Sequence, residues 1–460
     1  MRKMEKMWND ERKTYTAGQI LKFVIPSLAG ALAFLMPIPD KGTLNTALGL
    51  LIDWGKGGAL KPYLPTAAMI AVVLSAAVSL WAVLARPRFV TERPFLRELF
   101  CVSPFWLGSR LLGAALYVVI LYKIGPEVLW NMDNGGTPGL VLAPALLIVF
   151  SVLAAFVPLL TDYGLMEYVG TFARPIMGPL FRLPGRAAID CLASWVGSSS
   201  VGVVITTKVH DQGYYSDREA AIISSTFSVI SVAYIYVMAD FVKLPHKYLQ
   251  ILFSVYAVTF ILALIMPRIW PLSSIPDTFS GKAGKQRDGD DMPKDAKLGE
   301  WALKLAIERA ERQKLSDTAA AFIRTLLSLL VSTMPLVISW GTLVLLVANN
   351  TPVFQFLARP FAWMLELMRI PEAGEVGIAF ILSYADQFLA AVVGSTVHTD
   401  AARFMCAGIS ATGLIYMTEV GVLILNSSIP LGPGKLTCIY VIRAVLTVFL
   451  LSPFAWYFCM

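Results

Sequence analysis

Hydrophobic positions in this chain fall into long runs that short polar stretches separate. A helix that crosses a bilayer needs about twenty predominantly apolar residues, and the windows 66–84, 140–160 and 437–458 meet that requirement. The pattern predicts spanning helices near residues 18–37, 65–85, 106–124, 139–161, 219–241, 248–267, 322–347, 401–425 and 436–459. With two less regular apolar stretches, 187–207 and 376–396, we expect an all-α polytopic membrane protein of about nine to eleven transmembrane helices.

Basic residues in the loops predict the orientation of these helices. Cytoplasmic loops of membrane proteins are enriched in Lys and Arg, and such residues cluster in the N-terminal tail and in the loop after the second span. The loop near 125–138 has no Lys or Arg and is expected outside. The tail also lacks a short apolar core followed by a small-residue cleavage site. We therefore expect a cytoplasmic N-terminus and a first apolar segment that stays in the protein.

The segment 187–207 conflicts with a simple count of crossings. The loop near 162–187 and the polar stretch that begins at Arg268 are both basic, and both are therefore expected in the cytoplasm. Three apolar segments lie between them, and three full crossings cannot return to the same side. We predict that 187–207 is a re-entrant hairpin, since non-helical backbone is tolerated at membrane depth where protein or a water-filled cavity surrounds it.

A second copy of this region follows in the C-terminal part of the chain. The same five features occur twice in the same order: first Ala173–Pro175, Leu183-Pro184, Ser194-Trp195, Val209-His210 and Met238–Asp240, then Ala358–Pro360, Ile370-Pro371, Ser383-Tyr384, Val397-His398 and Met417–Glu419. The first copy starts in the cytoplasm and the second follows a span that leaves it, so we expect Arg174 inside and Arg359 outside. By the repeat, 376–396 is a second re-entrant hairpin whose tip meets the first near the midplane. Many secondary transporters are built from such inverted repeats.

A long polar stretch divides the two copies. Its first part is rich in Gly and Asp and is expected to be disordered, whereas 297–314 has the charge spacing of a helix. A solvated tether is favoured here over a partner-binding segment. The expected organisation is a cytoplasmic tail (1–17), a three-helix scaffold (18–138), a first repeat (139–267), a cytoplasmic linker (268–321) and an inverted second repeat (322–460).

Composition excludes several classes of function. Hydrophobic residues make up 57% of the chain and charged residues 15%, whereas a soluble domain carries roughly a quarter charged residues. The net charge of +7 lies in loops beside the apolar segments, so nucleic acid is not an expected partner. The five cysteines are scattered without a CxxC pair, so we expect no metal, disulfide or cofactor. No nucleophile elbow, metal motif or phosphate loop is present, which argues against an enzyme.

A family resemblance rests on the helix 168–183, the Trp195–Ser199 loop and the inverted copy at 353–425. From Tyr168 onward the chain resembles the Gate, or nucleoside-recognition, superfamily, and its whole length resembles the YjiH-like bacterial inner-membrane proteins. Over roughly 139–460 it is similar to concentrative nucleoside transporters. The resemblance implies an elevator-type mechanism driven by Na⁺ or H⁺, and a multi-pass protein of the bacterial inner membrane.

The hairpin tips hold the first candidate substrate-binding residues. A carboxylate in an apolar stretch is by default a functional hypothesis, and Asp386 is one, although a structural bond to a helix end is the alternative. Gln387 beside it can both donate and accept hydrogen bonds. In the first hairpin, Ser198, Ser199 and Ser200 could line a cavity or simply allow close helix packing. The resemblance supports Asp386-Gln387-Phe388 as an acidic and aromatic hairpin tip, while the serines depart from the Gln and Glu of that family.

Further candidates lie on the spans that follow each hairpin. Asp386, Glu419 and Asp240 are the candidate sites for a coupling ion or proton, with an interfacial carboxylate as the alternative for Asp240. Arg443 lies well inside the last span and needs an anion, for which Glu419 and Asp386 are candidates. The turn Asn426, Ser427 and Ser428 resembles the family's helix break and is a candidate for substrate binding, with a plain external loop as the alternative.

These features together predict a secondary transporter of a small polar metabolite, nucleoside-like by resemblance and cation-coupled. The alternative is a channel-like or accessory membrane component that works with a second Gate-type subunit. The expected partners are the small-molecule substrate and the lipid bilayer, and a homo-oligomer stays open.

Overall fold

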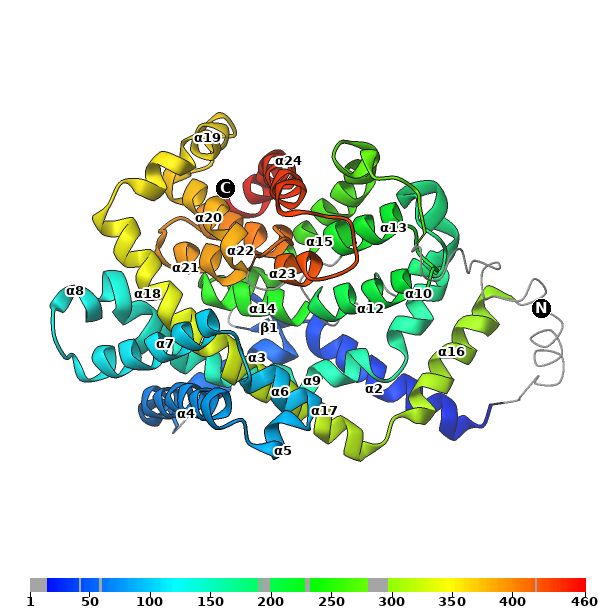
Figure 1. Cartoon of the computed structure of the whole chain (residues 1–460), viewed down its shortest axis with the longest axis horizontal. Coiled ribbons are helices and arrows are strands. Elements are labelled where there is room, and N and C mark those ends of the chain that lie inside the picture. Colours follow the sequence, from blue (N-terminus) through cyan, green and yellow to red (C-terminus); the bar gives the residue numbers. More distant parts are fainter. Residues whose placement is uncertain are drawn as a thin grey trace.

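The structure, a computed structural model, describes residues 15–40, 43–57, 60–188, 191, 199–227, 232–279, 297–417 and 420–460 (Figure 1). Almost all of these residues are helical. Eight helical stretches among them are long and apolar enough to cross a membrane: Ala17–Leu35, Lys61–Ala85, Pro104–Tyr122, Glu127–Thr161, Asp217–Phe241, Pro245–Ser274, Leu315–Val347 and Pro433–Cys459. The prediction of an all-α polytopic membrane protein is confirmed.

The N-terminal part of the chain forms a bundle with one small strand pair. Its elements are α2 (Ala17–Leu35), β1 (Pro37–Asp40), β2 (Thr43–Thr46), α3 (Ala47–Gly57), η1 (Lys61–Tyr63), α4 (Leu64–Ala85), α5 (Arg88–Thr91), α6 (Pro94–Phe100), α7 (Pro104–Tyr122) and α8 (Glu127–Trp130). The sequence did not predict the antiparallel pair β1–β2. α2 begins with a capping box, in which Thr16 and Gln19 satisfy each other's backbone amides.

The middle of the chain contains the first repeat. Its elements are η2 (Met132–Leu142), α9 (Ala143–Thr161), α10 (Leu165–Ile176), η3 (Met177–Phe181), α12 (Ser199–Asp211), α13 (Asp217–Ile222), η4 (Ile223–Phe227), α14 (Val232–Phe241), η5 (Pro245–Lys247), α15 (Tyr248–Ile265), η6 (Met266–Arg268) and η7 (Leu272–Ser274). The central part of the predicted first hairpin, residues 189–190 and 192–198, lies outside the described residues.

The C-terminal part contains the second repeat. Its elements are α16 (Leu298–Arg312), α17 (Leu315–Ser328), η8 (Leu329–Thr333), α18 (Met334–Asn350), α19 (Val353–Leu367), α20 (Ala373–Ala385), α21 (Gln387–Thr396), α22 (Asp400–Thr412), α23 (Val420–Leu425) and α24 (Pro433–Cys459). α20 and α21 pack against each other and reverse at Asp386, which gives 376–396 the helix–turn–helix form of a hairpin. At 1.5 Å per residue they are about 20 and 15 Å long, too short for either to cross a bilayer core of about 30 Å.

The two repeats share the way in which their first helix ends. Arg182 after η3 and Arg369 after α19 both have positive φ angles, 59° and 54°. The next residue is buried in each case, Leu183 or Ile370, and its amide bonds back to the carbonyl of Met177 or Leu365. Proline then stops the helix in both copies. The two helices that the sequence predicts to open the repeats therefore end with the same local backbone geometry.

The linker helix α16 packs against the rest of the protein, whereas a solvated tether was expected. α16 packs against α10 and α2, and four of its residues are buried, namely Ala302, Ala306, Ile307 and Ala310. A Cβ on Gly164, whose φ is 97°, would lie 2.3 Å from the Ala306 carbonyl oxygen. The expectation of a tether is wrong for 298–312, because small apolar residues spaced four apart form a buried stripe there. The part expected to be disordered, 280–296, lies outside the described residues.

Charged groups hold the docked helix α16 in place. The Arg309 guanidinium lies 3.8 Å from the Asp162 carboxylate and 3.7 Å from that of Glu167. Burial raises the pKa of both carboxyls, and the Arg309 charge opposes that rise. The linker therefore contacts the first repeat through both apolar and ionic groups.

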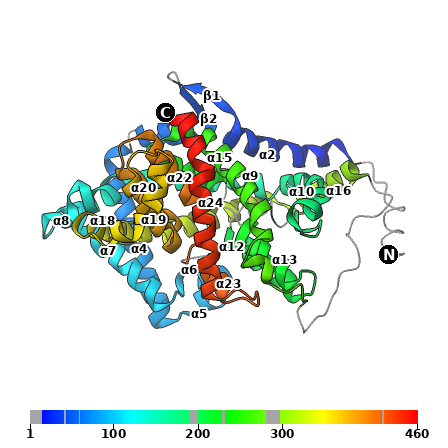
Figure 2. The ribbon, with the colours of Figure 1, turned by 90° about the horizontal axis from the view of Figure 1, so that it is seen from above.

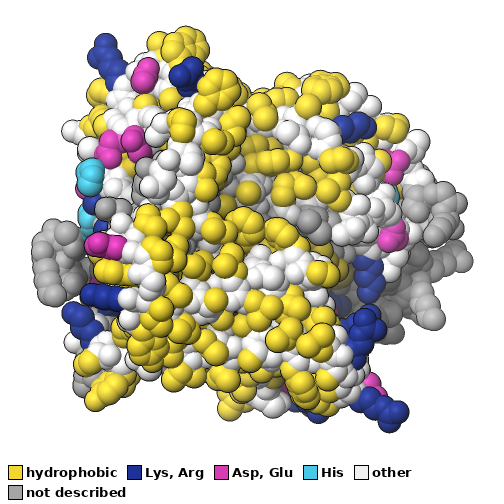
Figure 3. All heavy atoms as spheres, turned by 60° about the vertical axis from the view of Figure 1, so that its left-hand side comes forward, with side chains coloured by type: hydrophobic (Ala, Val, Ile, Leu, Met, Phe, Trp, Pro, Cys, Tyr) yellow, Lys and Arg dark blue, Asp and Glu magenta, His cyan; other side chains and the backbone are white. Residues whose placement is uncertain are grey.

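The surface is suited to lipid. Large hydrophobic side chains are exposed on many helices, including Leu28, Ile70, Leu84, Phe253 and Trp363. Hydrophobic side chains cover most of the face in Figure 3, while charged side chains gather toward its left and right margins. Soluble proteins rarely expose apolar patches of this extent. Figure 2 shows α24 crossing the molecule, with α23 near one end and β1 and β2 near the other.

Candidate functional site

The tip of the second hairpin is formed by a single extended residue. Asp386, with φ −149° and ψ 140°, separates α20 from α21, and its Oδ1 accepts a hydrogen bond of 2.7 Å from the Phe388 amide. Asp386 is therefore the N-cap of α21, a contact that typically stabilises a helix by about 1 kcal/mol. Both Asp386 and Gln387 are half-buried. The structural bond to a helix end, which the sequence left open, is present.

The helix after this hairpin stops inside the protein. α22 ends at Thr412, and residues 413–416 are not helical. The expected single span 401–425 is therefore wrong. Leu414 has a φ of 63°, and the Met417 amide donates to the Tyr384 carbonyl at 2.9 Å. The break in this span consequently lies against the hairpin tip.

Two side chains cap the internal end of α22. The Tyr416 hydroxyl donates to the Ser410 carbonyl at 2.5 Å. Arg443 of α24 donates to the Thr412 carbonyl through Nε at 3.3 Å and Nη2 at 2.9 Å, and its Nη1 lies 3.5 Å from the Thr226 carbonyl of η4. Among the described residues, the hydrogen bonds of Arg443 all run to main-chain carbonyls and none to Asp386. Glu419, the other carboxylate predicted as its partner, lies outside the described residues.

Hydroxyl groups tie the hairpin to its neighbours. Ser410 donates to the Gln387 carbonyl and contacts the Met238 sulfur at 3.0 Å. Ser383 of α20 is hydrogen-bonded to Tyr440 of α24, and Tyr384 to Thr437 of the same helix at 2.6 Å. α24 therefore holds both the hairpin tip and the end of α22.

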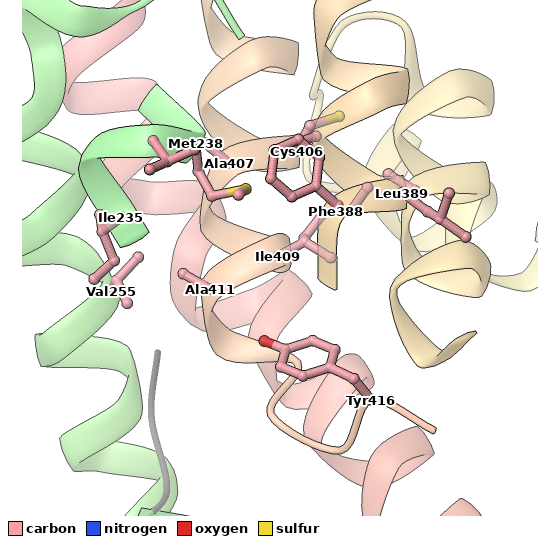
Figure 4. Close-up of a cluster of buried hydrophobic side chains, with 14 of the residues drawn as sticks. Ile235, Met238, Val255, Phe388, Leu389, Cys406, Ala407, Ile409, Ala411 and Tyr416 are labelled. Carbon is pink, nitrogen blue, oxygen red and sulfur yellow. The ribbon is translucent and has the colours of Figure 1, made fainter. Parts of the chain in front are cut away.

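An apolar layer surrounds this polar centre. Phe388, the second residue of α21, makes edge-to-face contacts with Tyr234 and Phe241 of α14, at ring separations of 5.9 and 4.8 Å. Figure 4 shows Phe388 and Leu389 beside Ile409 of α22, with Tyr416 just beyond the end of that helix. α14 belongs to the first repeat, so the two repeats meet at the hairpin tip.

The first repeat contributes buried hydroxyls to the same region. Ser224, Ser225 and Thr226 of η4 are fully buried, and the Thr226 hydroxyl has no hydrogen-bond partner among the described residues. Ser199 and Ser200 lie in the first turn of α12, but their side chains are outside the description. Ser198 and Glu419 lie wholly outside the described residues, so their predicted roles stay predictions.

Asp240 lies away from the hairpin tip. Its carboxylate is 2.5 Å from the Lys56 ammonium of α3, and the two side chains are 9% and 26% exposed. Lys243, in the turn after α14, donates to the Ser395 carbonyl, which is about 12 Å along α21 from Gln387. The structure therefore places Asp240 in an ion pair near the open end of the hairpin.

The turn after α23 is also separate from the helix break. Asn426 and Ser428 are exposed and Ser427 is half-buried. Ser428 donates to Asp211 at 2.5 Å and contacts Nδ1 of His210 at 3.1 Å. A helix does end at this turn, since α23 stops at Leu425 and α24 begins at Pro433, and the structure adds a second interruption at 413–416. Ser428 helps to hold the exit of α12.

His210 connects the two repeats at this exit. Its Nε2 lies 2.7 Å from the Asp217 carboxylate, and its ring is almost fully buried. A carboxylate only accepts hydrogen bonds, so Nε2 of His210 donates to Asp217. The matching residue of the second copy, His398, is exposed.

Sequence reasoning missed three contributors to the site, Thr226, Thr412 and Tyr416. A signal for the break was available, because Gly413 interrupts an apolar stretch and an isolated glycine weakens a helix. Nothing in the sequence pointed to Thr226. Among the described residues no group of three or more His, Cys, Asp or Glu side chains could hold a metal.

Two comparisons show what this chain is similar to. A family model named Gate, with the description nucleoside recognition, matches residues 143–244, which run from α9 to just beyond α14. An uncharacterized protein of Alkalihalophilus pseudofirmus is 39% identical over 439 residues, covering 95% of this chain and 94% of that protein. The similarity to this relative therefore extends well beyond the Gate region, over the N-terminal helices and the C-terminal repeat.

Proposed function

This chain belongs to the same family as the Alkalihalophilus pseudofirmus protein and contains a Gate domain, and from that premise we propose that it is a secondary transporter of a small polar metabolite. The Gate description favours a nucleoside-like solute. We further propose cation coupling by Na⁺ or H⁺, elevator-type alternating access, and a location in the bacterial inner membrane with a cytoplasmic N-terminus.

One observation carries this proposal: a hairpin tip and an internal helix end meet inside a membrane protein. The Tyr384 carbonyl receives the Met417 amide, and Asp386 and Gln387 lie at the same tip. Main-chain groups that leave regular helices at membrane depth are tolerated where they line a cavity or are buried in protein. Secondary transporters bind their substrates at such discontinuous helices.

The repeat supports the same function. The shared ending at Arg182 and Arg369 and the shared order of helices favour a second, inverted Gate-like copy over residues 322–460. On this proposal residues 18–138 are a scaffold, and α16 of the linker joins that scaffold to the first repeat. Alternating access then requires one of these units to move against the other.

Uptake by reconstituted vesicles tests the proposal. The purified protein alone should accumulate a radiolabelled solute from a panel of nucleosides, amino acids, dipeptides and carboxylates. Accumulation should require an imposed ion or proton gradient, and protein-free vesicles are the control. If no solute accumulates under any gradient although the protein is folded, the carrier proposal fails, and the accessory-component alternative with a second Gate-type subunit gains support.

A further inference from the structure

The internal end of α22 places main-chain carbonyls and a partial negative charge inside the membrane protein. The last four carbonyls of a helix have no partner within the helix, and the aligned peptide dipoles place about half a negative charge there. At α22 the Ile409 carbonyl receives the Gly413 amide, and that of Ser410 receives the Tyr416 hydroxyl. The Thr412 carbonyl receives Nε and Nη2 of Arg443.

Arg443 is deep inside the protein. It is fully buried and lies about 15 Å along α24 from Pro433, in a helix about 40 Å long. No ion pair joins it to a carboxylate in the part of the chain that the structure describes. A guanidinium keeps its charge under all ordinary conditions, and among the described residues the carbonyls of Thr412 and Thr226 are the groups that compensate it.

These contacts resemble those of a bound cation. In transporters with discontinuous helices, the C-terminal ends of half-helices and unwound carbonyls coordinate Na⁺ or H⁺. Here a guanidinium tethered to α24 already occupies that position at α22, and it reaches the carbonyl of Thr226 in the first repeat.

We propose that Arg443 is a resident cation, whose guanidinium takes the place of a free coupling ion at the internal end of α22. This inference rests on the proposed transport function where it concerns coupling. Since the resident charge neither dissociates nor loses its proton, Na⁺ does not bind at this helix end and uptake does not require Na⁺. Coupling then needs a group that can exchange a proton, and among the described residues Asp386 at the adjacent hairpin tip is a carboxyl group that can.

The wild-type protein gives the first test. Its thermal unfolding temperature in detergent should be the same in NaCl, KCl and choline chloride of equal ionic strength. Uptake driven by a proton gradient should likewise be unchanged when choline replaces Na⁺. A saturable stabilisation by Na⁺, or uptake that stops without Na⁺, overturns the proposal.

Substitution of Arg443 gives the second test. Arg443→Ala leaves a space at the Thr412 carbonyl, so this variant should unfold at a lower temperature and regain stability in millimolar guanidinium or methylguanidinium chloride. The gain should increase with concentration as expected for binding to the folded state. Arg443→Met fills the space without charge and is the matched control, which should be destabilised but not rescued. Arg443→Lys keeps a positive charge on a shorter contact and should be destabilised less than Arg443→Met.

Two results would contradict the resident-cation proposal directly. In one, Arg443→Ala and Arg443→Met respond identically to guanidinium, which means that the site has no cation preference. In the other, small carboxylates or phosphate stabilise the wild type and not Arg443→Met, which means that Arg443 binds an anionic solute. If Arg443→Ala does not fold, the comparison of salts in the wild type still decides. The unfolding measurements need no transport, so a failure of the proposed function is recognised separately.

Discussion

Asp386 has the structural role that the sequence left open as the alternative to transport. Its carboxylate caps α21 through the Phe388 amide, and capping is enough to explain an acidic residue at a hairpin tip. The residue type alone therefore does not establish a role in transport. A test must keep the cap and remove the charge.

Asp386→Asn separates these two roles. Asparagine is about as good an N-cap as aspartate, so the variant should fold with an unfolding temperature close to that of the wild type. If Asp386 exchanges a proton or contacts the substrate, gradient-driven uptake should be abolished. Asp400→Asn is the matched control, because Asp400 is a partly exposed carboxylate at the start of α22 that pairs with Lys247. Normal uptake by Asp386→Asn, normalised to folded protein, would remove this residue from the transport cycle.

Single residues were predictable only in part. The sequence showed that Arg443 lies inside a span and must be compensated, because a buried charge without compensation costs several kcal/mol. The sequence did not show which group compensates the Arg443 charge, since the Thr412 carbonyl becomes available only when α22 ends there. Asp240 was placed correctly at a helix end, but its partner Lys56 comes from α3, about 180 residues earlier, and no local pattern specifies that pair.

At the scale of elements, the second hairpin is fastened at its base. Glu372, with a φ of 53°, precedes α20, and its carboxylate accepts hydrogen bonds from the amides of His398 and Thr399 and from the Thr399 hydroxyl. These contacts join the start of α20 to the end of α21. Burial raises the pKa of Glu372, but the hydrogen bonds from Thr399 and His398 outweigh burial and lower it overall.

The lowered pKa of Glu372 gives a pH dependence with a definite sign. A carboxyl that is more acidic in the folded state stabilises it above the ordinary pKa of glutamate, and this stabilisation disappears as the pH falls through the folded pKa. Glu372→Gln should therefore lower the free energy of unfolding at neutral pH by about 1 kcal/mol or less, because the group is partly exposed. The unfolding temperature should fall accordingly. The difference from wild type should shrink in acid.

Thermal unfolding across the acidic range, with Glu375→Gln as the control, checks this expectation. Glu375 is an exposed residue in the first turn of α20, and its substitution should leave the pH profile as in the wild type. If the unfolding temperature of Glu372→Gln runs parallel to that of the wild type at every pH, the contacts of Glu372 at the base of the hairpin do not depend on the carboxylate charge.

Helices were predicted best where a single pattern, the long apolar run, specifies them. Long apolar runs located eight of the nine predicted spanning helices, although the helical stretches that begin at Glu127 and Leu315 and the one that ends at Ser274 extend further than predicted. The break at 413–416 was missed, because the residues around it remain apolar and only contacts with Tyr384 and Arg443 stabilise it. The docking of α16 was also missed, since its buried stripe of alanines is weakly hydrophobic and resembles a solvated helix in sequence.

At the scale of the whole molecule, the proposed transport mechanism requires two halves of opposite orientation. The sequence gives reasons for this in its basic loops and in the repeated order of motifs. The structure adds the matching helix ends at Arg182 and Arg369. Transport by alternating access requires the two copies to face opposite sides of the membrane, so their sidedness is the central claim to be tested.

Accessibility of single cysteines tests this claim most directly. Arg182→Cys and Arg369→Cys are introduced separately into a variant in which Cys101, Cys191, Cys406, Cys438 and Cys459 are replaced. Both positions are exposed at the end of their repeat's first helix. A thiol reagent that does not cross the membrane should label position 369 in intact cells, and position 182 only in inverted vesicles. Labelling of both positions from the same side would contradict the inverted repeat and the transport mechanism built on it.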